Sequence, residues 1–113
     1  MKKLLFFYCV FFASVANAQE WIEVDDASRL LWQMTANGIV YFRNISEFNS
    51  AHDGCCYSYK LDVTTPGGKA LWTTILAKMA SHRRITLGFP SIGSSGNVQT
   101  LNFIGRHAHS TNE

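Results

Sequence analysis

The order of apolar and polar residues along the chain begins with the pattern of a β-hairpin. Two runs rich in aromatic and β-branched residues, 28–35 and 39–45, lie on either side of Asn37-Gly38. Asn-Gly is a strong hairpin signal, because both residues tolerate the positive φ values that a tight turn requires. We therefore expect two antiparallel strands at about 28–35 and 39–45.

A third strand is predicted after a polar, turn-prone loop. In the stretch CYSYKLDV (56–63), polar residues alternate with Tyr57, Tyr59, Leu61 and Val63. Strict alternation is typical of a strand with one buried face. We expect both tyrosines to lie on that buried face.

The next segment, TTPGGKALWTTILAKMASH (64–82), has the pattern of an amphipathic helix. Thr65 can cap the helix and Pro66 suits its first position, where the missing N–H of proline has no helical partner to lose. Apolar residues then follow the helical period. They are Leu71, Trp72, Ile75, Leu76 and Met79.

Two further strands complete the pattern. RRITLGFP (83–90) places Ile85, Leu87 and Phe89 on one face, and VQTLNFIG (98–105) alternates again before a polar tail at 106–113 that we expect to be frayed. The order β-β-β-α-β-β predicts a five-stranded OB-fold-like barrel, with the helix between the third and fourth strands. A flat sheet with one helix on it is the alternative.

The first eighteen residues have the pattern of a secretory signal peptide. MKKLLFFYCVFFASVANA has two lysines directly after Met1, continues through a mainly apolar run of twelve residues (4–15) and ends in Ala-Asn-Ala. The apolar run is too short for a membrane span, which needs about 20 residues. We expect cleavage after residue 18, one domain at 19–113, a periplasmic or secreted location and no transmembrane anchor.

The balance of basic and acidic residues limits the kinds of partner that we expect. The full chain has ten basic residues against eight acidic ones, and removal of Lys2 and Lys3 with the signal would leave the two signs equal. A neutral domain lacks the positive surface that binds phosphate backbones. We therefore expect no nucleic-acid partner.

The stretch YKLDVTTPGGKALWTTILAKMASHRRITLGF carries a resemblance to a known family. A strand ending in L-D-x-x-T, a helix start of the P-G-G-K-A kind and a basic residue opening the next strand resemble the B subunits of AB5 toxins, of the subtilase-cytotoxin and typhoid-toxin type. The likeness covers roughly residues 28–105. It implies an OB-fold that binds glycans and closes into a ring of five copies.

The sequence departs from that family at its cysteines. The family usually places a second cysteine in the loop between strands four and five, to bond the one before strand three. Here that loop is SIGSSGNVQT and contains none. Since exported proteins meet an oxidising environment, we expect Cys55 and Cys56 to form a vicinal disulfide or an intermolecular one.

Catalytic and metal chemistry are weakly indicated. His52, Asp53 and either cysteine would crowd a triad into one pentapeptide, whereas triad partners normally converge from separate elements. His107 and His109 could share a strand face with His52 nearby, yet two ligands do not make a site. We expect no enzyme activity, no catalytic residue, no metal and no cofactor.

A binding function is the remaining prediction. Aromatic rings can stack on sugar faces or fill a core; Trp32 and Trp72 are assigned to the core, and Phe48 to an exposed contact. The candidate ligand-binding residues are Asn44, Ser46, Glu47, Phe48, Tyr57 and Tyr59. We expect an exported, glycan-binding protein similar to a toxin B subunit, forming a homo-oligomer, or alternatively a periplasmic structural or accessory protein that acts through a protein partner.

Overall fold

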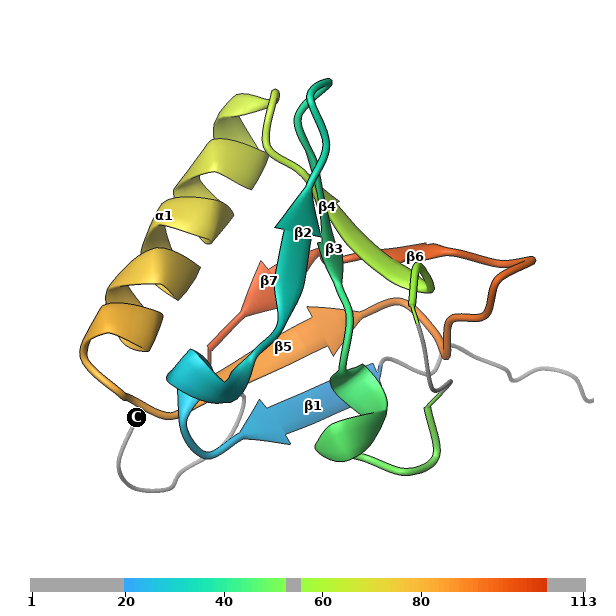
Figure 1. Cartoon of the computed structure of the whole chain (residues 1–113), viewed down its shortest axis with the longest axis horizontal. Helices are drawn as coiled ribbons and strands as arrows, with labels where there is room; N and C mark the ends of the chain where they lie inside the picture. The colour runs from blue at the N-terminus through green and yellow to red at the C-terminus, as the bar shows by residue number, and fades with distance from the viewer. Residues whose placement is uncertain (1–19, 53–55, 106–113) are drawn as a thin grey trace, which may run out of the picture.

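The structure is a computed structural model that describes residues 20–52 and 56–105. The expected signal peptide, Cys55 and the expected tail lie outside these residues. The strands are β1 (Glu20–Val24), β2 (Trp32–Met34), β3 (Ile39–Phe42), β4 (Tyr59–Asp62), β5 (Ile85–Phe89), β6 (Gln99–Thr100) and β7 (Phe103–Ile104). One α-helix, α1 (Pro66–Ala80), and two short 3-10 helices, η1 (Ala27–Arg29) and η2 (Ile45–Glu47), complete the described chain (Figure 1).

The strands form two sheets. One has the order β2-β3-β4-β6, with β6 parallel to β4 and the other pairs antiparallel. The second has the order β1-β5-β7 and is antiparallel throughout. The chain changes sheet four times: between β1 and β2, between β4 and β5 by way of α1, between β5 and β6, and between β6 and β7. The strands of one sheet run across those of the other (Figure 1).

The prediction of a mainly β chain with one helix is confirmed. The predicted number and order of strands are wrong, because the described residues form seven strands in two open sheets, in the order β-β-β-β-α-β-β-β, and not five strands in a closed barrel. The expected strand at 28–35 is shortened because Asp26 caps η1, and the expected strand at 98–105 divides between Thr100 and Phe103. Strand β1 was not predicted. A single flat sheet is wrong for the same reason.

The predicted hairpin is confirmed, although Gly38 and not Asn37 adopts the positive φ expected of both residues. Strands β2 and β3 pair antiparallel across a turn in which Gly38 has a φ of 87°. The backbone N–H of Gly38 donates to the carbonyl of Thr35 at 3.0 Å, and that of Thr35 to the carbonyl of Ile39 at 2.8 Å. The positive φ is accessible to glycine at no steric cost, which explains why the turn falls at this position.

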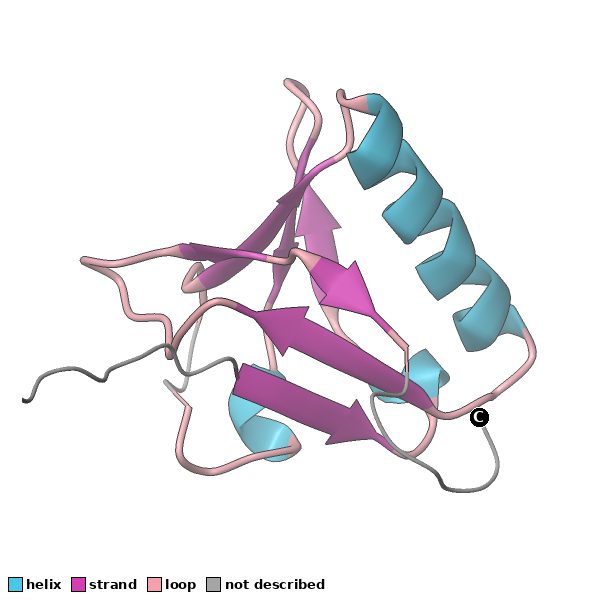
Figure 2. Cartoon of the chain, turned by 180° about the vertical axis from the view of Figure 1, so that it is seen from behind, coloured by secondary structure: helices cyan, strands magenta, loops and turns pink. Residues whose placement is uncertain are grey.

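The start of α1 is also as predicted. The Thr65 hydroxyl accepts a hydrogen bond from the backbone N–H of Gly68 at 2.9 Å, and Pro66 is the first helical residue. Trp72 and Ile75 are buried, whereas Leu76 is 41% exposed. The helix packs against η1 and β4 and runs along one side of the molecule (Figure 2).

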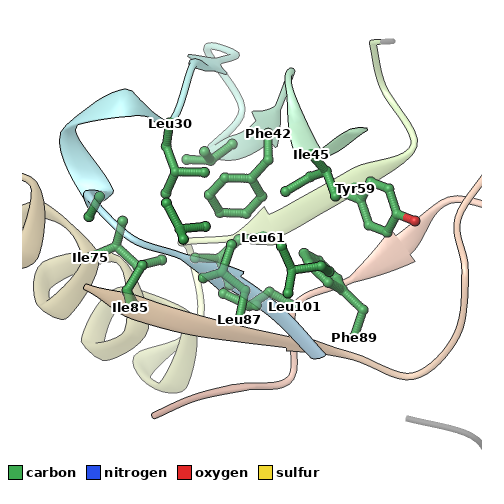
Figure 3. Close-up of a cluster of buried hydrophobic side chains, with 14 of the residues drawn as sticks. Leu30, Phe42, Ile45, Tyr59, Leu61, Ile75, Ile85, Leu87, Phe89 and Leu101 are labelled. Carbon is green, nitrogen blue, oxygen red and sulfur yellow. The ribbon is translucent and has the colours of Figure 1, made fainter. Parts of the chain in front are cut away.

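One hydrophobic core joins both sheets and the helix (Figure 3). The ring of Phe42 lies 6.3 Å from that of Phe89 on β5 and 6.5 Å from that of Trp72 on α1, measured between centroids. Trp72 is therefore a core residue, as predicted. Trp32 is 43% exposed and meets Trp72 edge-on at 5.0 Å, so its assignment to the core is wrong: it lies at the sheet edge.

Candidate functional site

An exposed group of side chains occupies the outer face of the sheet that contains β2, β3 and β4. Gln33 pairs with Tyr41 across β2 and β3, and Tyr41 pairs with Lys60 across β3 and β4. Cross-strand partners share one face of a sheet, so these three residues form a row. Their neighbours along the strands, such as Val40 and Leu61, are buried on the opposite face.

Tyr57 and Arg43 complete this group. The ring of Tyr57 meets the ring of Tyr41 edge-on, with 5.0 Å between centroids and an interplanar angle of 89°. The guanidinium carbon of Arg43 lies 4.9 Å from the centroid of Tyr57. The Gln33 Oε1 accepts hydrogen bonds from Arg43 Nη1 at 2.6 Å and from the Tyr57 hydroxyl at 3.0 Å. We call Gln33, Tyr41, Arg43 and Tyr57 the tyrosine platform.

The tyrosine platform is held in one arrangement while staying open to solvent. Tyr57 is 49% exposed, yet its hydroxyl and its ring both have partners within the platform. A cation over an aromatic face and an edge-to-face ring pair each contribute about 0.5–1 kcal/mol at such exposed sites. A ligand would therefore meet an aromatic surface that needs little ordering on binding.

The charge around the tyrosine platform is mixed, with a positive excess. Arg43 belongs to it, and Lys60 and Asp62 follow on the same face of β4. The hydroxyl and backbone N–H of Thr64 donate to Asp62 and hold the pKa of its carboxyl below the usual range, and the charge of Lys60 adds to this effect. The platform thus offers ring surfaces, amide and hydroxyl groups and positive charge, which suit binding.

Asn44 was a predicted ligand contact, and the structure places it in the interior instead. Its side chain is buried, its Oδ1 accepts from the backbone N–H of Leu31 at 2.9 Å, and its Nδ2 donates to the carbonyl of Arg29 and to Glu47 Oε1. An amide with these partners joins η1, β2 and η2. Its role is structural.

The neighbouring candidates form a surface network around the same asparagine. Arg29 Nη2 lies 2.8 Å from Glu47 Oε2, and the Arg29 guanidinium lies 5.3 Å from the ring centroid of Phe48. The Asn44 amide, followed by Arg29, lowers the pKa of the exposed Glu47 carboxyl. Phe48 packs partly buried against the core, so its assignment as an exposed contact is wrong. Ser46 is half-buried on η2.

The two candidate tyrosines separate. Tyr59 is 1% exposed, with its hydroxyl accepting from the backbone N–H of Gly93 at 2.8 Å. Tyr57 lies outside, which corrects the prediction that both share the buried face. The sequence alternates back to Tyr57, but strand β4 and its pairing begin only at Tyr59. Of the six predicted ligand contacts, Tyr57 belongs to the tyrosine platform.

The cysteine predictions are only partly within the described residues. Cys56 is disulfide-bonded, and Cys55 lies outside the described residues, so the structure does not describe the partner in this bond. The choice between a vicinal and an intermolecular bond stays a prediction. For the triad considered above, Asp53 and Cys55 are not described, and the side chain of His52 is fully buried.

A second set of residues has the composition of a catalytic triad but not its geometry. Ser28 Oγ lies 3.1 Å from His82 Nδ1, and Asp26 Oδ2 lies 3.3 Å from the same nitrogen. A triad histidine uses one nitrogen for the acid and the other for the nucleophile. Here Ser28 also donates to Asp26, and this bond lowers the pKa of the Asp26 carboxyl. Asp26 therefore serves as the cap of η1. Across the described ranges, no cluster of three or more His, Cys, Asp or Glu side chains could hold a metal ion.

Sequence reasoning missed Gln33 and Arg43. Gln33 lies directly across the hairpin from Tyr41. A two-residue turn at Asn37-Gly38 would have paired Tyr41 with Met34. The observed loop is one residue longer, closed by the bond from the Thr35 N–H to the Ile39 carbonyl, and it pairs Tyr41 with Gln33 instead. Arg43 follows Tyr41 by two positions, which is the spacing of side chains on one face of a strand.

No protein-family model, curated protein or solved structure matches the chain. Among the described residues, no helix has the length and apolar character needed to cross a membrane.

Proposed function

We propose that the chain is an exported, non-enzymatic protein that binds a glycan on the tyrosine platform. The observation that carries this proposal is a half-exposed tyrosine held by three neighbours: Arg43 over its ring, Tyr41 at its edge and Gln33 at its hydroxyl. A pyranose ring presents an apolar face of C–H groups surrounded by hydroxyls. An aromatic ring beside amide, hydroxyl and guanidinium groups is complementary to both parts.

The sheet topology supports the OB-like part of the proposal. If β1 and β2 are counted as one bent strand, and β6 and β7 as another, each of these two bent strands contributes to both sheets. The pairing then runs from β2 through β3 and β4 to β6, and from β7 through β5 to β1. This cyclic order, with β4 and β6 parallel, agrees with an open Greek-key barrel. The ring of five copies that the resemblance implies belongs to the same proposal.

The test is a glycan-array screen of the chain from residue 19, followed by titration of the best ligand. We expect Tyr57→Ala to weaken binding about tenfold or more, equivalent to ~1.4 kcal/mol, because the stacking surface is lost. Tyr57→Phe keeps the ring and should retain most of the affinity. Raising the salt concentration should weaken a ligand that carries a carboxylate more than a neutral one, because Arg43 and Lys60 are solvent-accessible.

Phe48→Ala is the matched control. Phe48 is an aromatic residue of the predicted site that the structure packs against the core beneath Arg29. This variant should lower stability and leave glycan affinity unchanged. Equal losses of affinity in Tyr57→Ala and Phe48→Ala would contradict binding at the tyrosine platform, and an array without any signal would contradict glycan binding altogether.

A specific observation favours the second candidate, a periplasmic accessory protein that acts through a protein partner. Leu31, Trp32 and Met34 are 59%, 43% and 44% exposed, and they lie on or beside β2, the edge strand of its sheet. Exposed apolar residues along an unpaired strand edge suit a protein surface better than a sugar. This candidate becomes the preferred one if the array shows no glycan.

A further inference from the structure

A row of polar side chains crosses all four strands of the sheet that carries the tyrosine platform. Gln33 on β2 pairs with Tyr41 on β3, Tyr41 with Lys60 on β4, and Lys60 with Thr100 on β6. Residues in register share one face of a sheet, and the neighbours of Lys60 and Thr100 along their strands are buried on the other face. These four residues, which we call the polar row, therefore lie on the outer face and run from one edge strand to the other (Figure 1).

The polar row offers hydrogen-bonding groups that the described fold leaves available. Gln33 uses its Oε1 within the tyrosine platform, and its Nε2 has no partner among residues 20–52 and 56–105. Over the same ranges, the Tyr41 and Thr100 hydroxyls make no hydrogen bond and the Lys60 ammonium makes no ion pair. Amide N–H, hydroxyl and ammonium groups can all donate. The row is therefore complementary to a ligand rich in acceptor oxygens.

The length of the polar row indicates how much of a ligand it can contact. Neighbouring strands lie about 4.8 Å apart, so the two ends of a four-strand row are separated by roughly 14 Å. The repeat of an extended β-1,4-linked pyranose chain is close to one strand spacing, so about three consecutive sugar units match the row. Both ends of the row lie on edge strands. This arrangement suits internal units of a chain, whereas a single small sugar is better held in a concave pocket.

Lys60 determines which sugar unit fits the middle of the polar row. Its ammonium is the positive charge between Tyr41 and Thr100. Asp62, two positions along β4, has its carboxylate bonded to the hydroxyl and backbone N–H of Thr64. A ligand carboxylate at Lys60 would accept a charge-assisted hydrogen bond, which is stronger than one between neutral groups. Charge complementarity therefore favours an acidic sugar at this position.

We propose that the outer face of this sheet binds a linear acidic glycan. One sugar lies beside Tyr57, the next unit places a carboxylate at Lys60, and a third contacts Thr100. This inference rests on the proposed function, because the first sugar occupies the tyrosine platform. It goes further by naming the ligand class, which is a chain of at least three pyranose units with carboxylates on internal units.

The first experiment measures how affinity depends on chain length and charge. The probes are β-1,4-linked oligomers of mannuronic acid with one to five units, and neutral β-1,4-linked mannose oligomers of the same lengths, titrated calorimetrically into the purified protein. In the acidic series we expect affinity to rise at least about tenfold between one and three units and then to level off, because longer chains extend past the polar row. At three units the neutral chain should bind more weakly, since it has no carboxylate for Lys60.

The second experiment uses variants along the polar row. Lys60→Met keeps most of the aliphatic stem and removes the charge, so it should weaken the acidic trimer about tenfold and leave the neutral series unchanged. Lys69→Met removes the same charge from an exposed position on α1 and is the matched control, which should leave both series unchanged. Thr100→Val removes a hydroxyl at the far end of the row. It should abolish the gain between two and three units without changing the affinity for two.

Several results would overturn this proposal. They are equal affinities for one and four acidic units, equal affinities for the acidic and neutral series, equal losses in Lys60→Met and Lys69→Met, and no binding by either series. The proposed function is tested separately by the glycan-array ligand and its dependence on Tyr57. A ligand that Tyr57→Ala releases, but whose affinity depends neither on chain length nor on Lys60, would uphold the proposed function and reject the linear acidic chain.

Discussion

Asn44 illustrates why residue type alone did not separate candidate ligand contacts from structural residues. An asparagine in a polar stretch beside serine, glutamate and phenylalanine has the composition of a sugar contact. The side chain nevertheless turns inward, because the backbone N–H of Leu31 and the carbonyl of Arg29 need partners where β2 and η2 meet. A buried backbone group without a partner is costly. The Asn44 side chain is therefore used in hydrogen bonds within the fold and is not available to a ligand.

Replacing Asn44 by alanine tests this structural role. The change leaves the Leu31 N–H and the Arg29 carbonyl without their partner, so we expect a loss of about 1–3 kcal/mol in the free energy of unfolding. Urea denaturation measures the loss. The matched control is Asn102→Ala, at an exposed position, which should stay within about 0.5 kcal/mol of wild type. A wild-type stability for Asn44→Ala would return this residue to the list of candidate contacts.

At the scale of elements, sequence patterns predicted those whose causes are local. The cap at Thr65, the proline after it and the apolar period define α1, and Asn37-Gly38 defines the hairpin. The start of β4 was placed too early, because alternation continues back to Tyr57 while pairing does not. Pairing depends on a partner strand far along the chain, and a periodic pattern does not contain that information.

The two adjacent glycines at the start of α1 should respond oppositely to alanine. A Cβ on Gly68 would lie 1.8 Å from the carbonyl oxygen of Asp62, a backbone atom that cannot move without shifting the end of β4. A Cβ on Gly67 meets nothing within 4 Å. Gly67→Ala should therefore be neutral or stabilise the chain by up to about 1 kcal/mol, through helix propensity and a less flexible unfolded state.

Gly68→Ala should destabilise the chain by more than Gly67→Ala stabilises it, since overpacking against a fixed group costs about 1–3 kcal/mol. Thermal unfolding followed by circular dichroism measures both variants under one condition. The pair is informative because side-chain chemistry and helix position are almost the same. Similar stabilities for the two variants would mean that the close approach of Gly68 to the Asp62 carbonyl does not limit the residue at this position.

At the scale of the whole molecule, the least predictable features are the points where the chain changes sheet. The bend through η1 and the break between Thr100 and Phe103 each turn an expected single strand into two short ones. Burial on one face of the sheet is visible in the sequence as alternation, whereas a change of sheet depends on how the two layers cross. The tyrosine platform was predicted only at Tyr57, for a related reason: its members come from three separate segments.

One core beneath both sheets predicts that they unfold together. Phe42 contacts Trp72 on the helix and Phe89 on the second sheet, so truncating it weakens all layers at once. We expect Phe42→Leu to lower the free energy of unfolding by about 1–2 kcal/mol, less than the ~3–5 kcal/mol typical of phenylalanine to alanine in a core. Leu76→Ala on the exposed side of α1 is the control and should have a much smaller effect.

Tryptophan fluorescence and far-ultraviolet circular dichroism should report the same transition midpoint in every variant, as a two-state domain requires. Separate midpoints in the wild type would mean that the sheets are independent, and the contacts of Phe42 would then not be what joins them.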